Sequence, residues 1–203
     1  YRSALTGIEP AIEGVSLEVL DADDRLLLVN ESGTTVVVLG YDGEPYLRVT
    51  PEGVFRNVRS PATWLNEDRY ADVDLPPIVD AAAPPEWEQI SEEPRVEWHD
   101  HRIHWMSPTA PPQVRDDPES AHRILDWNVP LEAGGGAVVV SGTLDYSPPD
   151  EAGFSLFLLV PPVALVLAGG VLWLARGRGR GGDEAASGAP LGAHADPRDD
   201  GVR

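Results

Sequence analysis

The feature that most limits the fold of this chain is an apolar run near its C-terminal end. Residues 154–175, FSLFLLVPPVALVLAGGVLWLA, contain no charged side chain. A helix of this length, rising about 1.5 Å per residue, would cross a hydrocarbon layer of about 30 Å. Nothing near the run is apolar enough to surround it as a core helix. The sequence therefore predicts a single transmembrane helix over residues 154–175.

The charges on either side of this run predict its orientation. Asp150 and Glu151 precede it, whereas three arginines between residues 176 and 180 follow it. Because positive charge gathers on the cytoplasmic side of membrane helices, we expect residues 1–150 outside the cell. A tail-anchored cytoplasmic protein is the alternative, and it would carry the arginines across the membrane. No signal peptide precedes Tyr1, so we expect a leader that has been removed or is missing.

The composition separates an acidic outer domain from a polar tail. The chain has 34 Asp and Glu against 15 basic residues, all of them Arg, and the acidic excess lies before residue 154. Such a surface repels phosphate backbones, which argues against nucleic-acid partners, and it concentrates cations. Residues 176–203 have few large apolar side chains, so we expect a disordered cytoplasmic tail. The chain has no cysteine, so the outer domain depends on its core alone.

Short apolar runs predict strands in the outer domain. They are rich in β-branched residues and leucine, and the turn-forming segments DADD, ESG and GYDGE separate them. The runs are residues 15–20, 25–30, 34–39 and 45–50. A second group over residues 124–146 predicts two more strands around a glycine-rich turn. Strands about ten residues apart predict an immunoglobulin-like β-sandwich over residues 1–150, in a mainly β chain.

Two acidic segments between these strands have a simpler explanation than cation binding. Residues 60–94 are dense in Pro, Ala and Asp, which predicts a long irregular excursion. Their carboxylates do not have the spacing of an EF-hand loop. The acidic residues 21–24 lie between two predicted strands, so we expect a hairpin turn there rather than a cation site.

Three of the chain's five histidines lie within residues 98–106, WHDHRIHWM. If residues 96–106 form one strand, His99 and His101 share one face, while His104 and Met106 share the other. Each pair is half of a copper or zinc site, and the thioether would suit Cu(I). A third ligand would come from elsewhere, for instance His122. The alternative is that two tryptophans anchor this strand in the core while the histidines bond to carboxylates.

Catalytic motifs are missing from the sequence. We find no nucleophile elbow, HExxH motif or glycine-rich phosphate loop, so we predict no catalytic residues and no enzyme. A hydrolase that uses His99 or His104 with Asp100 stays open, because a catalytic triad is recognised by geometry. Stacking of envelope sugars on Trp64, Trp87 and Trp105, beside carboxylates, is a further alternative.

Several linked motifs resemble a known family. They are YRSALTGIEP, VLGYDGEPYLRV, RSPATWLNEDRY, WHDHRIHW, DWNVPL and GTLDY. Together they are similar to a family of uncharacterised, signal-peptide-bearing, single-pass membrane-anchored proteins of high-GC Gram-positive bacteria. The resemblance covers residues 1–148 and implies an extracytoplasmic domain. In that family the pattern is W-H-D-x-R-x-H-W, and the position that matches His101 is not always His, which weighs against the His99 and His101 metal pair. The resemblance thus implies a structural or recognition cluster, which comprises His99, Asp100, Arg102, His104 and Trp105.

These observations lead to one expectation and one alternative. We expect a non-enzymatic binding or accessory module of the cell envelope without a cofactor. It would be held in the lipid bilayer by residues 154–175 and would meet a membrane-protein or cell-wall partner. The alternative is an extracytoplasmic copper- or zinc-binding protein that uses His99, His101, His104 and Met106.

Overall fold

The computed structural model describes residues 1–149, and its strands show the alternating burial that their sequences favour. In β3, Leu26, Leu28 and Asn30 are buried while the residues between them are less so, as expected for side chains that point to opposite faces of a sheet. The strands are β1 (Arg2–Glu9), β2 (Val15–Leu20), β3 (Arg25–Asn30), β4 (Val36–Leu39), β5 (Pro45–Thr50), β6 (Gly53–Asn57), β7 (Trp87–Ser91), β8 (Arg95–His99), β9 (His122–Ala133) and β10 (Gly136–Tyr146). The helices are α1 (Pro61–Leu65), the 3-10 helix η1 (His101–Ile103) and α2 (Pro112–Asp116).

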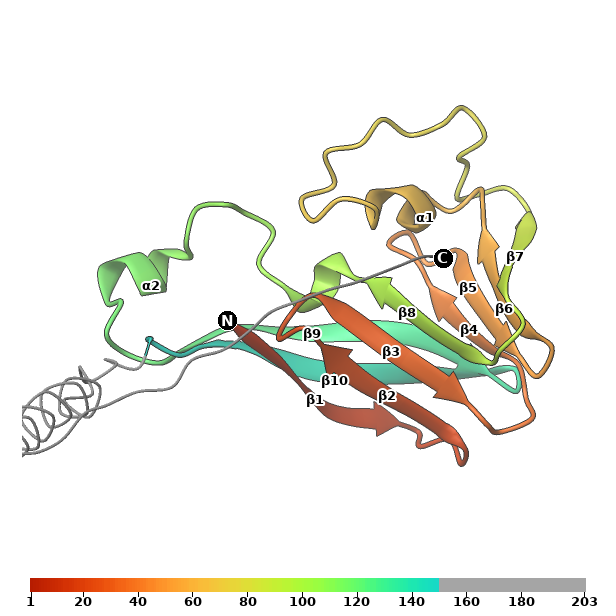
Figure 1. Ribbon diagram of the computed structural model, residues 1–203, viewed down its shortest axis with the longest axis horizontal. Coiled ribbons are helices and arrows are strands. Elements are labelled where there is room, and N and C mark those ends of the chain that lie inside the picture. Colours follow the sequence, from red (N-terminus) through yellow and green to blue (C-terminus); the bar gives the residue numbers. More distant parts are fainter. Residues whose placement is uncertain (150–203) are drawn as a thin grey trace, which may run out of the picture. The chain divides into compact units, whose positions relative to one another are not determined.

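The strands form two sheets that share one hydrophobic core (Figure 1). The larger sheet has seven strands in the order β1-β10-β9-β4-β5-β6-β7, and the smaller has the order β2-β3-β8. Their neighbours pair antiparallel, for instance β3 with β8. Leu26 and Leu28 of the small sheet and Val36 and Val38 of the large sheet are fully buried. The predicted mainly β architecture is therefore confirmed.

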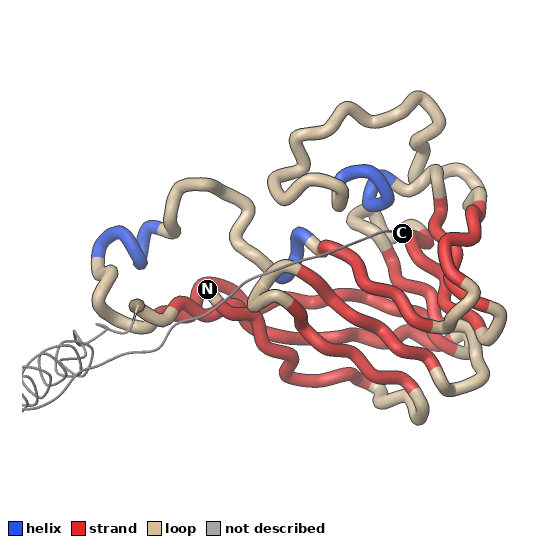
Figure 2. Tube along the Cα trace, viewed as in Figure 1, coloured by secondary structure: helices blue, strands red, loops and turns tan. Residues whose placement is uncertain are grey.

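The longest hairpin follows its prediction. The cluster at 124–146 forms β9 and β10, which pair along their whole length. Gly134 and Gly135 make the turn between them with φ angles of 57° and 80°. Only glycine adopts these angles without steric cost. Figure 2 shows how strands dominate the described chain and how short its helices are.

Two expectations about local structure need correction. The strand expected over residues 96–106 ends at His99 and gives way to η1, because the side chain of Asp100 accepts a hydrogen bond from the backbone N–H of Arg102. Such local side-chain bonds compete with a β-ladder. The excursion expected over residues 60–94 is irregular only in its middle, since it begins with α1 and ends with β7. Ser60 caps α1 through a bond from the Ala62 N–H.

Among residues 1–149, no helix is both long and apolar enough to cross a membrane. The predicted transmembrane helix at 154–175 and the predicted tail at 176–203 lie outside the described residues.

Candidate metal centre

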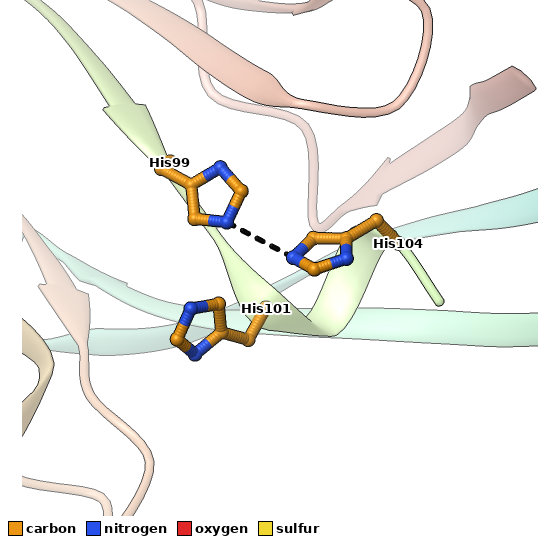
Figure 3. A group of neighbouring side chains, drawn as sticks. All are labelled: His99, His101 and His104. Atoms are coloured by element: carbon orange, nitrogen blue, oxygen red, sulfur yellow. Dashed lines mark hydrogen bonds between the residues drawn. The ribbon is translucent and has the colours of Figure 1, made fainter. Parts of the chain in front are cut away.

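The end of β8 and the turn after it bring three histidines together (Figure 3). His99 is the last residue of β8, His101 opens η1, and His104 follows it. One ring nitrogen from each histidine lies within 4.8 Å of the others. A continuous strand would have placed His104 on the opposite face from His99 and His101. The turn therefore builds a cluster that the strand expectation did not allow.

A buried ion pair holds this turn in place. Asp100 is fully buried, and its carboxylate accepts bonds from the Trp98 indole N–H at 2.8 Å and from the Arg102 guanidinium at 2.7 and 2.8 Å. Arg102 also donates to the Leu39 carbonyl at 3.0 Å. Asp100 and Arg102, two members of the predicted recognition cluster, thus make their hydrogen bonds inside the fold. Their contacts shape the turn that carries the histidines.

Carbonyl oxygens fix the proton on one nitrogen of two of the rings. His104 Nδ1 lies 3.1 Å from the Trp105 carbonyl, and His101 Nε2 lies 2.8 Å from the Asp68 carbonyl. Carbonyl oxygens can only accept, so these two nitrogens donate, and the second nitrogen of each neutral ring carries the lone pair that a metal ligand needs. His99 Nδ1 lies 3.1 Å from Asp24 Oδ1, which is an ion-pair contact when the ring is protonated.

The contact between His99 and His104 is the most informative one in the site. Their Nε2 atoms are 2.9 Å apart (Figure 3). Because His104 Nδ1 donates to the Trp105 carbonyl, His104 Nε2 carries a lone pair and accepts a hydrogen bond from the Nε2–H of His99. A metal ion bound by both nitrogens would take the place of this proton.

Burial favours the neutral, ligating form of the His101 and His104 rings. His104 is 1% exposed and His101 is 9% exposed. Burial lowers the pKa of His104, and the nearby Arg69 guanidinium lowers it further. Burial also lowers the pKa of His101, with a smaller contribution from His99. The lowered pKa values leave both imidazoles uncharged at neutral pH, because desolvation disfavours the cationic ring.

Asp24, which the sequence assigned only to a turn, contacts the His99 ring at 3.1 Å. The β2–β3 hairpin is confirmed by its pairing, and its turn holds Asp21 and Ala22 at φ angles of 52° and 67°. This left-handed backbone brings the Asp24 carboxylate to His99. Arg69 binds Asp24 at 2.6 Å and Asp23 at 3.1 Å. No spacing rule could have found Asp24, because it meets His99 only through the pairing of β3 with β8.

The remaining predicted ligands lie apart from the three histidines. The Met106 side chain is 41% exposed, whereas His104 points inward. His122 bonds to the Asp117 carbonyl at 2.6 Å and stacks on Tyr146. Trp105, which is partly buried against the core, donates its indole N–H to the Thr109 carbonyl at 2.8 Å. Three histidines, without Met106 or His122, thus make up the cluster.

The fold and the site together define a β-sandwich domain with a buried three-histidine cluster at the end of one edge strand. Comparison of the chain with protein-family models, with curated proteins and with solved structures gives no match. The functional inference therefore comes from the site alone.

Proposed function

We propose that this protein binds a copper or zinc ion through His99, His101 and His104. The observation that supports the proposal is the convergence of three ring nitrogens within 4.8 Å of one another, two of them only 2.9 Å apart. Imidazole is a preferred ligand of both metals. A hydrogen bond from the non-ligating nitrogen to an oxygen is the usual companion of a metal-bound histidine.

The spacing of the nitrogens is close to what a metal requires. At a metal–nitrogen distance of about 2.0 to 2.1 Å, two ligands of a tetrahedral ion are about 3.3 Å apart. The observed spacing, from 2.9 Å for one pair to at most 4.8 Å within the cluster, brackets this value. Binding would require His99 and His104 to separate slightly and His101 to move inward. If His101 ligates through Nε2, it exchanges its bond to the Asp68 carbonyl for the metal.

The proposal also gives the expected envelope module a ligand. We place the described domain outside the cell, anchored by the predicted helix at 154–175, in a non-enzymatic binding role. The acidic surface, part of a net charge of −19, supports this role because it raises the local concentration of metal cations. The immunoglobulin-like type stays a prediction: constant-type domains of that fold divide their strands four and three, whereas this sandwich divides them seven and three.

Metal-dependent stabilisation tests the proposal. The full chain is purified, stripped with a chelator and titrated with Zn²⁺, Cu²⁺ and, under reducing conditions, Cu⁺. A metal that binds only the folded state stabilises it by about 2.7 kcal/mol at about 100 times its Kd. We expect the melting temperature to rise with one bound ion per chain. His99→Gln and His104→Gln should each abolish the rise.

The matched control is His122→Gln, which changes a histidine outside the cluster. It should keep the full metal response. Absence of any bound metal in the unmodified chain would refute the proposal, and so would a response that His99→Gln and His104→Gln leave intact.

A further inference from the structure

A pocket of about 200 Å³ lies beside the turn that carries Arg69 and Tyr70. Three aromatic side chains line it, those of Tyr1, Tyr70 and Trp105. Two charged side chains, those of Asp23 and Arg69, belong to the same lining. None of the three clustered histidines lines this pocket, so it is a site separate from the candidate metal centre.

The aromatic side chains of the pocket are exposed and held in place. Tyr1 and Tyr70 are 41% and 44% exposed, which is a large apolar surface to leave in water unless a ligand covers it. The Tyr70 backbone N–H donates to Asp68 Oδ1 at 2.8 Å, and the Trp105 indole N–H donates to the Thr109 carbonyl at 2.8 Å. These bonds order the wall before a ligand arrives, which lowers the entropy lost on binding.

The two charged side chains in the wall balance each other. Arg69 Nη2 lies 3.1 Å from Asp23 Oδ2, and Arg69 Nη1 lies 2.6 Å from Asp24 Oδ1. A guanidinium has about five N–H donors and a carboxylate accepts up to about four hydrogen bonds, so both groups keep capacity for a ligand. The wall therefore favours a neutral ligand that both donates and accepts hydrogen bonds.

Trp105 differs from the other two tryptophans that were considered for sugar stacking. The Arg48 guanidinium lies 4.5 Å from the centre of the Trp87 ring, and that of Arg56 lies 6.0 Å from the centre of the Trp64 ring. Such cation–π contacts cover one face of each ring. Trp105 instead shares a pocket with two tyrosines. Of the three tryptophans, the structure favours Trp105 as the stacking surface.

We infer that this pocket binds one ring of a neutral saccharide. A pyranose ring has apolar C–H groups on its faces, which would pack on Tyr70 and Trp105, and hydroxyls at its rim, which would bond to Asp23 and Arg69. The pocket, at about 200 Å³, is smaller than the roughly 300 to 1,000 Å³ of most small-molecule sites. It therefore fits a single ring, either of a free sugar or at one unit of a glycan chain.

Titration of the metal-free chain with sugars tests this inference apart from the proposed metal binding. The full chain is purified in a detergent without a sugar headgroup, stripped with a chelator and titrated with glucose and N-acetylglucosamine, followed by saturation-transfer NMR. We expect saturable binding of these neutral sugars. Sorbitol, which has the hydroxyls without the ring, is the control. A β-1,4-linked dimer of N-acetylglucosamine distinguishes the two sources, because a site for glycan chains binds the dimer more tightly than the single sugar.

Glucuronic acid tests the charge of the ligand. It differs from glucose by one carboxylate, and the acidic chain, with a net charge of −19, repels anions. We expect it to bind more weakly than glucose. Tighter binding of glucuronic acid would overturn the assignment of a neutral ligand.

Tyr70→Ala tests the aromatic wall. It removes an exposed ring, so the stability of the fold should change little, while the sugar loses a stacking surface. We expect the affinity for N-acetylglucosamine to fall about tenfold, whereas Tyr70→Phe, which keeps the ring, should stay within about twofold. Leu75→Ala is the matched control, because Leu75 is also 44% exposed but does not line the pocket.

Asp23→Asn tests the polar wall. Asparagine keeps the shape of the side chain but replaces a charged acceptor by a neutral one, and hydrogen bonds to charged groups are about twice as strong. We expect an affinity about three- to tenfold weaker. Asp126→Asn is the matched control, since it removes the same charge from a carboxylate that also pairs with an arginine but lies outside the pocket.

The outcomes separate this inference from the proposed metal binding. Absence of saturable binding of both neutral sugars would overturn the inference and leave the metal proposal standing. Equal sugar affinity in Tyr70→Ala and Leu75→Ala would overturn the placement of the sugar in this pocket. Sugar binding that depends on Tyr70 in a chain that binds no metal would support the inference while the metal proposal fails.

Discussion

At the scale of single residues, Asp24 determines how His99 can act. Its carboxylate lies 3.1 Å from His99 Nδ1, where it stabilises positive charge on the ring or on a metal bound to it. Carboxylates in this position also raise the basicity of a ligating histidine. Arg69 and Arg25 contact the same carboxylate at 2.6 and 3.5 Å. A residue of the β2–β3 turn therefore prepares a ligand on β8.

Asp24→Asn should weaken metal binding by about 10- to 100-fold, the usual effect of losing such a partner. Competition with a coloured chelator at pH 7 measures the change. Asp23→Asn is the matched control, since Asp23 binds Arg69 at 3.1 Å but does not contact a histidine. If the two variants lost affinity equally, the effect would come from Arg69 and the surface charge rather than from the contact between Asp24 and His99.

The buried ion pair of Asp100 and Arg102 should contribute to the free energy of unfolding. Asp100→Ala would leave the Arg102 guanidinium, whose side chain is 17% exposed, without its counterion. Breaking a buried pair in this way costs about 3 to 5 kcal/mol, and urea denaturation measures it. Asp126→Ala, which removes an exposed partner of Arg123, should cost no more than about 1 kcal/mol. A small effect of Asp100→Ala would instead favour the surface-recognition role that the family resemblance implied.

At the scale of elements, three strands of the large sheet meet at one glycine. Gly142 of β10 lies opposite Trp127 of β9. The Trp127 indole N–H donates to Ser3 Oγ of β1 at 3.1 Å. A Cβ at position 142 would lie 2.0 Å from the Trp127 ring and 2.5 Å from the Ala4 carbonyl. The missing side chain thus makes room for the tryptophan that joins β1, β10 and β9.

Gly142→Ala should therefore destabilise the fold by at least about 1 to 3 kcal/mol, because a rigid ring and a backbone oxygen must both move. Thermal unfolding followed by circular dichroism measures the loss. Gly136→Ala is the control, since the nearest atom there is 3.6 Å away, and it should change stability by about 0.5 kcal/mol or less. Equal melting temperatures for the two variants would contradict the packing described for Trp127.

At the scale of the whole molecule, the position of the domain relative to the membrane is the main prediction. If residues 154–175 span the bilayer with the arginines inside, protease added to intact cells should digest the acidic domain and spare a tag after Arg203. Permeabilised cells should lose both. Protection of the domain in intact cells would contradict the predicted orientation and the proposed extracytoplasmic role.

The sequence by itself determined the features that depend on neighbours along the chain. Short runs rich in β-branched residues and leucine, bounded by turn residues, predicted β3 and the β9–β10 hairpin, because these side chains favour extended backbone whatever the fold around them. Asp21 to Asp24 were predicted as a turn for a similar reason, since their polarity interrupts two apolar runs. The clustering of histidines in residues 98–106 was also visible in the sequence, and it indicated a candidate metal site in this segment.

Only the tertiary structure decided how these histidines meet. Alternation predicted that β8 continues to residue 106, but Asp100 is buried among Trp98, Arg102 and the body of the sandwich, and its carboxylate ends the strand. That turn brings His104 to His99, and the β3–β8 pairing brings Asp24 to the same ring. Both contacts result from long-range burial and pairing, which set side-chain partners that no local pattern of residues encodes.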